Sequence, residues 1–352
     1  MCFNTTTTTL IRCLLFASAL LPINPAVAFE KEEEQRFTVD NPEQVLRILS
    51  STDLNYFVPL ITTYQQTHET TEVLYTVASS TEVFKAIHDE KLDYDLVISS
   101  AMDLQTKLVN DGFAKRYSSV ETNNLPAWAK WQNSLFAFTQ EPAVLIASKK
   151  GLAELPVPNN RQDLITLLRD NPQYFKGKIG TYDLRISGAG YLFATQDVRQ
   201  SDAFWRLAEV MGSLSPKLYC CSSDMIEDLE SGEILMAYNV MGSYAEAVLK
   251  SNTDDTVIAL SDYTHFLLRT AFIPNTSTQP EAAATFIDFL IGNGGRKSIK
   301  QEAGLPPIDG EALAKDLHLR PIRLGPELLV YLDRIKRKRF LDEWTDAMVQ
   351  PP

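Results

Sequence analysis

The sequence contains none of the short motifs that usually carry catalysis. It has no Gly-x-Ser-x-Gly nucleophile elbow, no His-Glu-x-x-His metal motif and no phosphate-binding loop that ends in Gly-Lys-Ser/Thr. The segment Gly188-Ala189-Gly190 lacks the third glycine of a dinucleotide-binding fingerprint. We therefore expect a protein that is not an enzyme and that carries no cofactor and no resident metal.

Cysteine is scarce, with four residues in a chain of 352. Cys2 and Cys13 lie near the N-terminus, while Cys220 and Cys221 are adjacent, so a bond between the latter two would close a strained ring. The chain has no Cys-x-x-Cys motif. We interpret the adjacent pair as small, half-buried residues at a strand end, with a redox pair as the alternative.

Basic residues are outnumbered by acidic ones, 33 against 45, which gives a formal net charge of −12 at pH 7. Such a negative field disfavours nucleic acid, whose phosphates need a basic surface, so we exclude it as a partner. The one basic cluster, Lys336-Arg337-Lys338-Arg339, is flanked by acidic residues and is typical of a solvated helix face. A hydrophobic content of 45% indicates a folded rather than a disordered chain.

The N-terminal 28 residues have the order of a cleavable secretory signal. Arg12 is their only charge, the apolar run Cys13–Leu21 follows it, and Ala26-Val27-Ala28 supplies small residues for cleavage. A transmembrane anchor is the alternative, but the run is shorter than the ~20 apolar residues that span a bilayer. We expect cleavage after Ala28 and a periplasmic protein.

After an acidic leader, Glu30–Glu34, the next part of the chain repeats a strand, a polar loop and a helix. Three such units in succession predict a parallel sheet with helices on its faces. Each strand ends in a Ser/Thr cluster, at the edge where open α/β sheets bind ligands. The expected elements are strands Val45–Leu49, Glu72–Val77 and Leu96–Ile98, with helices Leu54–Thr67, from Ser79-Ser80-Thr81 through Asp89, and Met102–Asp111.

The second half of the chain repeats this plan and predicts an α/β unit of its own, beginning near residue 140. Its expected strands are Ala143–Ser148, Ile179–Thr181 and Leu235–Tyr238, its loops include Asn239–Ser243, and its helices are Arg161–Asp170, Tyr191–Asp197 and Tyr244–Leu249. An apolar strand, Phe266–Ile273, and helices Pro280–Ile291, Gly295–Glu302 and Glu327–Trp344 close the chain.

Three segments now point to a known family: Tyr238–Ala245, Gly180–Asp183 with Ser187–Tyr191, and Ile98–Asp103. They resemble the type II periplasmic solute-binding proteins of ABC transporters, in the branch with iron(III)-binding, hexose-phosphate-binding and phosphoglycerate transport regulatory proteins. The resemblance runs from about Val45 to the last helix. Its motifs are typical of the branch and not of one ligand.

The resemblance implies an α/β, two-lobed type II fold, in which each lobe is a mainly parallel sheet flanked by helices and two hinge strands join the lobes. It places the signal peptide at residues 1–28, a discontinuous lobe 1 at residues 29–142 and 270–325, and lobe 2 at residues 143–269. Residues 326–352 then form a C-terminal helix that packs on the outside.

Helix N-termini beside hydroxyl side chains suit an anionic ligand, because free N–H groups and a partial positive charge meet there. Arg185 is the only cation in these loops and could fork onto a phosphate or a carboxylate. The serines and threonines are equally ordinary N-caps, and Asp53 and Asp183 could bind sugar hydroxyls, cap a helix or pair with Arg185. The candidate ligand-binding residues are Ser51, Thr52, Asp53, Ser79, Ser80, Ser99 and Ser100 from lobe 1, and Asp183, Arg185, Ser187, Gly188, Tyr238, Asn239 and Ser243 from lobe 2.

Iron-binding members of the branch use an adjacent pair of tyrosines, because ferric ion prefers anionic oxygen ligands. This chain has Tyr238 and Tyr244 with five residues between them and no Tyr-Tyr pair anywhere. None of its four histidines, His68, His88, His265 and His318, lies in the strand-end loops. We therefore predict a small organic anion, a phosphorylated or carboxylated metabolite, in place of iron.

The resulting prediction is a monomeric periplasmic solute-binding component that captures this anion by lobe closure and delivers it to an inner-membrane ABC permease. Two alternatives remain open: a ligand-sensing accessory to a membrane histidine kinase, and a ferric iron transport protein. All three use the same closure of two lobes on a ligand.

Overall fold

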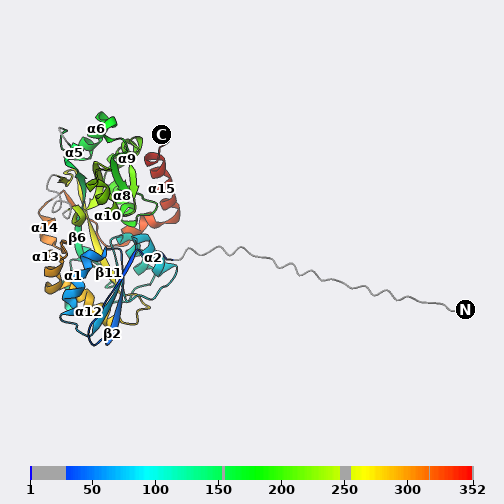
Figure 1. The fold of residues 1–352 in the computed structure, drawn as a ribbon, viewed down its shortest axis with the longest axis vertical. Helices are drawn as coiled ribbons and strands as arrows, with labels where there is room; N and C mark the ends of the chain where they lie inside the picture. The colour runs from blue at the N-terminus through cyan, green and yellow to red at the C-terminus, as the bar shows by residue number, and fades with distance from the viewer. Residues whose placement is uncertain (2–28, 153–154, 246–254, 317, 351–352) are drawn as a thin grey trace.

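The computed structural model describes Met1 and residues 29–152, 155–245, 255–316 and 318–350 (Figure 1). The expected signal peptide lies outside the described residues, apart from Met1, as does most of the helix expected at Tyr244–Leu249. Within the described residues, no helix combines the length and apolar character needed to cross a membrane.

The N-terminal part of the chain forms the parallel sheet that its three strand–helix units predict. Strand β2 (Gln44–Ser50) pairs in parallel with β3 (Thr71–Val77) and with β4 (Leu96–Ser99). These strands alternate with helices α1 (Leu54–Gln65), α2 (Ser80–His88) and α3 (Met102–Asn110). The acidic leader is partly ordered, because β1 (Glu33–Phe37) adds an antiparallel edge strand beside β3.

A second set of strands forms the other part of the sheet. Strand β7 (Ile179–Tyr182) pairs in parallel with β8 (Lys217–Tyr219) and with β9 (Met236–Met241). The flanking helices are α6 (Arg161–Asp170), α8 (Gly188–Gln200), α9 (Ala203–Ser213) and α10 (Ser222–Glu230), with short helices α5 (Lys149–Leu152) and α7 (Pro172–Phe175).

Two long strands connect the two parts. Strand β6 (Leu135–Ala147) pairs with β11 (Thr264–Phe272) up to Pro142, then with β9 and β10 (Thr256–Ile258) from Ala143 onward. Because β6 changes partners along its length, the strands in the described ranges form one continuous 12-stranded sheet through both parts. This mixed α/β sheet with flanking helices is the expected two-lobed fold; we call the β1–β4 side lobe 1 and the β7–β9 side lobe 2.

The remaining elements lie mostly on lobe 1, except for the C-terminal helix, which packs on lobe 2. They are α4 (Val120–Asn124), η1 (Ala127–Ala129), β5 (Lys130–Trp131), α12 (Pro280–Ile291), α13 (Asn293–Gln301), α14 (Gly310–Ala314), β12 (Leu319–Pro321), η2 (Pro326–Leu332) and α15 (Arg334–Met348).

Two sequence expectations are wrong in detail. Strand β9 continues through Met241, so Asn239 and Val240 belong to a buried strand and not to the expected loop, because Val240 pairs with Val144 of β6. The helix expected over Glu327–Trp344 is split at Asp333, which ends η2 in an extended conformation. The Asp333 carboxylate then caps α15 by accepting from the N–H groups of Ile335 and Lys336.

The C-terminal segment lies along the outside of the molecule (Figure 1). Helix α15 packs against α9 of lobe 2, where Phe340 stacks on Phe204, while η2 packs against α3 of lobe 1. Lys336, Lys338 and Arg339 of the basic cluster are exposed, as expected for a solvated face, whereas Arg337 is half-buried and lies 5.2 Å from the ring centroid of Tyr191. The segment therefore contacts both lobes.

Candidate functional site

The helices that follow the strands of the two lobes meet N-terminus to N-terminus. The Gly188 N–H, at the start of α8, donates to Ser80 Oγ at the start of α2 over 3.1 Å. Beside it, Thr81 Oγ1 donates to the Ile186 carbonyl oxygen over 3.0 Å. These bonds join lobe 1 to lobe 2 at the strand edge where an α/β sheet binds its ligand.

A buried ion pair lies where the two connecting strands cross between the lobes. Arg269 of β11 donates through Nε to Glu141 Oε1 of β6 over 2.6 Å, and both residues are fully buried. Burial lowers the pKa of Arg269, but the charge and the hydrogen bond of Glu141, together with the nearby Tyr244, raise it by more in total, so the guanidinium stays charged.

Each member of this pair also binds a predicted site residue. Arg269 Nη1 donates to Thr52 Oγ1 of lobe 1, and Ser243 Oγ of lobe 2 donates to Glu141 Oε2. Sequence reasoning missed Arg269 and Glu141 because they lie inside strands and not in strand-end loops. The sequence signal that could have identified them is a single acidic residue in one long apolar strand and a single arginine in the other.

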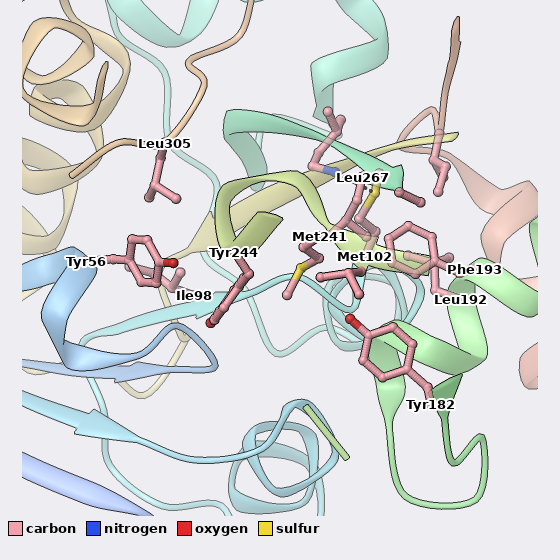
Figure 2. Close-up of a cluster of buried hydrophobic side chains, with 14 of the residues drawn as sticks. Tyr56, Ile98, Met102, Tyr182, Leu192, Phe193, Met241, Tyr244, Leu267 and Leu305 are labelled. Atoms are coloured by element: carbon pink, nitrogen blue, oxygen red, sulfur yellow. Dashed lines mark hydrogen bonds between the residues drawn. The ribbon is translucent and has the colours of Figure 1, made fainter. Parts of the chain in front are cut away.

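A pair of tyrosines from different lobes lies beside the ion pair. Figure 2 shows Tyr56 of α1 next to Tyr244, which follows β9; their ring centroids are 5.2 Å apart and their planes meet at 60°. Tyr244 Oη donates to Asp53 Oδ2 over 2.8 Å. Burial, with the negative charge of Asp53, raises the pKa of Tyr244 well above 10, so its phenol is neutral. Tyr56 and Tyr244 are far apart in the sequence, so the sequence did not indicate that they lie together.

The serines of the strand-end loops bind one another and the helix ends. Ser51 Oγ donates to Ser99 Oγ over 3.1 Å and accepts from the Ser100 N–H over 3.2 Å. Ser79 caps α2 by accepting from the Glu82 N–H, and Ser187 caps α8 by accepting from the Gly190 N–H. The capping alternative is thus confirmed for Ser79 and Ser187, while contact of these hydroxyls with a ligand stays a prediction.

Arg185, the cation singled out in the loops, already has a partner. Its Nε and Nη2 donate to the two oxygens of Asp183 over 2.8 and 2.6 Å, and Asp183 also accepts from the Arg185 N–H. Its guanidinium is exposed and lies 6.0 Å from the ring of Trp344 on α15. Arg185 would have to break its two side-chain hydrogen bonds with Asp183 before the same nitrogens could bind a ligand.

Tyr238 and Asn239 lie inside lobe 2 in a buried polar network. Tyr238 Oη donates to Asp197 Oδ2 over 3.1 Å and accepts from Arg161 Nε, while Asn239 Nδ2 donates to the same Asp197 oxygen over 3.0 Å. Burial raises the pKa of Asp197, but the charge of Arg161 together with the hydrogen bonds of His265 and Asn239 lowers it by more in total, to about 2. This network holds β9 against α6 and α8, so a structural role accounts for both predicted site residues.

Two lobes built on one sheet, with helix N-termini facing each other across the junction, define the type II periplasmic binding proteins. The chain matches the model of the bacterial extracellular solute-binding proteins over residues 46–305 and belongs to that family. It is therefore a periplasmic solute-binding protein of the kind that serves ABC transporters. No curated protein matches it.

Solved structures agree with this assignment. The chain is 30% identical to the substrate-binding protein of an ABC transporter from Agrobacterium tumefaciens, with 91% of this chain and 99% of that one covered and a TM-score of 0.85. The fold alone is shared with AfuA from Actinobacillus pleuropneumoniae, with fructose-6-phosphate bound (16% identity, 88% and 100% covered, TM-score 0.73). It is also shared with iron-bound HitA from Pseudomonas aeruginosa (16% identity, 86% and 99% covered, TM-score 0.67).

Proposed function

We propose that this protein captures a small organic anion between its lobes and delivers it, chemically unchanged, to an inner-membrane ABC permease. The observation that carries this proposal is the meeting of helix N-termini from both lobes, where α2 and α8 face each other at Ser80 and Gly188. Helix N-termini attract negative charge through their free N–H groups and dipoles. A phosphorylated or carboxylated metabolite fits this environment.

Capture works by closure, because a ligand that contacts both lobes favours the form in which they meet. The bonds from Gly188 to Ser80 and from Thr81 to Ile186 form only when the lobes are together. We place the lobe boundaries at residues 29–142 with 270–325 for lobe 1, 143–269 for lobe 2 and 326–352 for the C-terminal segment. The change of strand partners after Pro142 supports the first boundary.

Ferric iron is a second candidate, favoured by one specific observation. Tyr56, Tyr244 and Asp53 bring oxygen donors from both lobes together, which is the ligand type that a hard trivalent cation prefers. Binding would require both phenols to lose their protons, and the burial that raises the pKa of Tyr244 opposes this. The anion therefore remains the proposed ligand.

Thermal shift assays and calorimetry on the purified protein test this choice with phosphate esters, di- and tricarboxylates, and ferric citrate. We expect an increase in Tm with one class of organic anion, because a ligand that binds only the folded state stabilises it. Tyr244→Phe should weaken that binding modestly by removing the bond to Asp53. Arg185→Ala should change the affinity less, because Arg185 already pairs with Asp183.

An increase in Tm with iron salts alone would refute the organic anion. In that case Tyr56→Phe and Tyr244→Phe should each abolish iron binding, because each removes an oxygen ligand. Loss of anion binding in Arg185→Ala would show that Arg185 binds the ligand, as the sequence predicted.

A further inference from the structure

Among the described residues, Cys220, Cys221 and Asp224 form a cluster of possible metal ligands that the solute site does not use. The two Sγ atoms and one carboxylate oxygen all lie within 4.8 Å of one another. Cys220 Sγ is 2.7 Å from Cys221 Sγ and 3.5 Å from Asp224 Oδ2. Both thiols are partly exposed and Asp224 is exposed, so an ion could reach all three side chains.

The position of this cluster follows from the fold. Strand β8 ends at Tyr219 and α10 begins at Ser222, so the cysteines occupy the turn between them. The Asp183 N–H donates to the Tyr219 carbonyl oxygen, which places this turn beside the β7 loop. The thiols therefore lie at the same sheet edge as the proposed solute site, on the lobe 2 side.

The surroundings are negative, and they include a carboxylate from the other lobe. Burial raises the pKa of Glu32, which precedes β1 in lobe 1, and the charges of Asp53 and Asp224 raise it further. The pKa of Cys221 is raised by its hydrogen bond with Cys220, by burial and by the charges of Glu32 and Asp224. A bound cation would offset this repulsion and stabilise the thiolates.

We propose that Cys220, Cys221 and Asp224 bind one thiophilic divalent cation of the zinc class, with the fourth coordination position left to water. Two sulfurs and one carboxylate oxygen match the ligand types that zinc accepts. With Zn–S bonds of about 2.3 Å, a tetrahedral centre needs its sulfurs about 3.8 Å apart, so the thiols must rotate away from each other to bind. Known zinc sites with three protein ligands hold a water molecule or a substrate in the fourth position.

The test uses the full chain after reduction and removal of the reductant, titrated with Zn²⁺ against a chromophoric chelator and with Cd²⁺ while ultraviolet absorbance is followed. We expect one equivalent of either ion and a sulfur-to-cadmium charge-transfer band. Loss of an outer-shell partner lowers metal affinity by about 10–100-fold, so Cys220→Ser or Cys221→Ser should cost at least roughly 100-fold and Asp224→Asn at least roughly tenfold.

Glu227→Gln is the matched control, because it removes one exposed carboxylate from the same helix outside the cluster. Its affinity should equal that of the unchanged protein. Thermal unfolding of each metal-free variant checks that the fold is intact.

Three results would overturn the proposal: no stoichiometric binding by the reduced protein, a cadmium band that survives in Cys220→Ser/Cys221→Ser, or an Asp224→Asn affinity equal to that of Glu227→Gln. A disulfide between the two cysteines that persists after reductant treatment, shown by intact mass, would also overturn it. When the solute assays are run on metal-free protein, failure of this site leaves the proposed transport function standing.

Discussion

Arg269 and Glu141 show how a single buried pair can join several parts of the molecule. Their ion pair connects the two hinge strands, and their outer bonds reach Thr52 of lobe 1 and Ser243 of lobe 2. Such a pair is a weak source of net stability, because both charges lose their water, but removing one partner leaves an unpaired buried charge. Removing one partner should therefore lower the free energy of unfolding by more than the intact pair contributes to it.

We expect Arg269→Met to lower the free energy of unfolding by about 3–5 kcal/mol, because Glu141 is left buried without its cation. Urea titration followed by circular dichroism measures the change. The control is Arg339→Met, which breaks an exposed pair with Glu343 on α15 and should leave the urea midpoint unchanged. A loss in Arg269→Met as small as in the control would contradict the role assigned to the buried pair.

At the scale of elements, helix α3 carries a carboxylate that the solute site does not use. Asp103 is fully buried and accepts from the Leu104 N–H; burial raises its pKa to about 7, and Leu104 and Arg337 only partly counteract this. It lines a cavity of about 370 Å³ between α2, α3, α8 and the C-terminal segment, shared with Lys85 and Lys107. Its protonation is thus linked to the packing of four elements.

The sign of this linkage predicts a pH dependence. The folded protein keeps the Asp103 proton up to about pH 7, while the unfolded chain releases it near 3.8, so the stability that Asp103 contributes falls as pH rises through this window. The Asp103→Asn variant lacks this titration. From pH 5 to pH 8, its free energy of unfolding should therefore rise relative to that of the unchanged protein by up to a few kcal/mol, at about 1.4 kcal/mol per pKa unit.

Urea titrations at the two pH values measure this difference. Asp202→Asn, at an exposed position before α9, serves as the control and should show no such gain. An equal effect of pH on the two variants would mean that Asp103 is ionised in the folded protein.

At the scale of the whole molecule, function depends on how closely the lobes approach. A Cβ atom at Gly188 of lobe 2 would lie 2.7 Å from Ser80 Oγ, 3.1 Å from Ala101 Cβ and 3.1 Å from Leu104 Cδ1, all in lobe 1. Since every one of these contacts crosses between the lobes, a side chain at this position should hold them apart and leave each lobe folded.

Gly188→Val should therefore weaken solute binding roughly tenfold or more, because overpacking costs about 1–3 kcal/mol and each 1.4 kcal/mol is about tenfold in affinity. Calorimetry measures the affinity, and small-angle X-ray scattering with solute present should give a larger radius of gyration than for the unchanged protein. Gly294→Ala is the control, since a Cβ there meets nothing within 4 Å. Unchanged affinity in Gly188→Val would show that the α2–α8 contact is not part of the closed form.

The sequence alone determined the family, most of the strand–helix units and the helix starts that face the junction. Hydrophobic periodicity and capping residues are local signals, so α6 and α12 were predicted to the residue, whereas the helix expected at Tyr191–Asp197 begins earlier, at Gly188, after the Ser187 cap. The same local logic failed at β9 and at Asp333, where pairing with β6 and an aspartate cap overrode the pattern.

Only the tertiary structure decided which side chains meet between the lobes. Arg269 and Glu141 are 128 positions apart, and Tyr244 and Asp53 are 191 apart, so no sequence window contains both partners. Tyr238 and Asn239 were predicted for the site by their position, and the structure places both in the network around Asp197. A register shift between β6 and β9, with the positive φ of Asn239 (64°), interrupts the usual alternation of side chains, so these adjacent residues reach the same carboxylate. Strand pairing determines these contacts, because it fixes the register of distant segments and the side of the sheet to which each side chain points, which local propensity cannot encode.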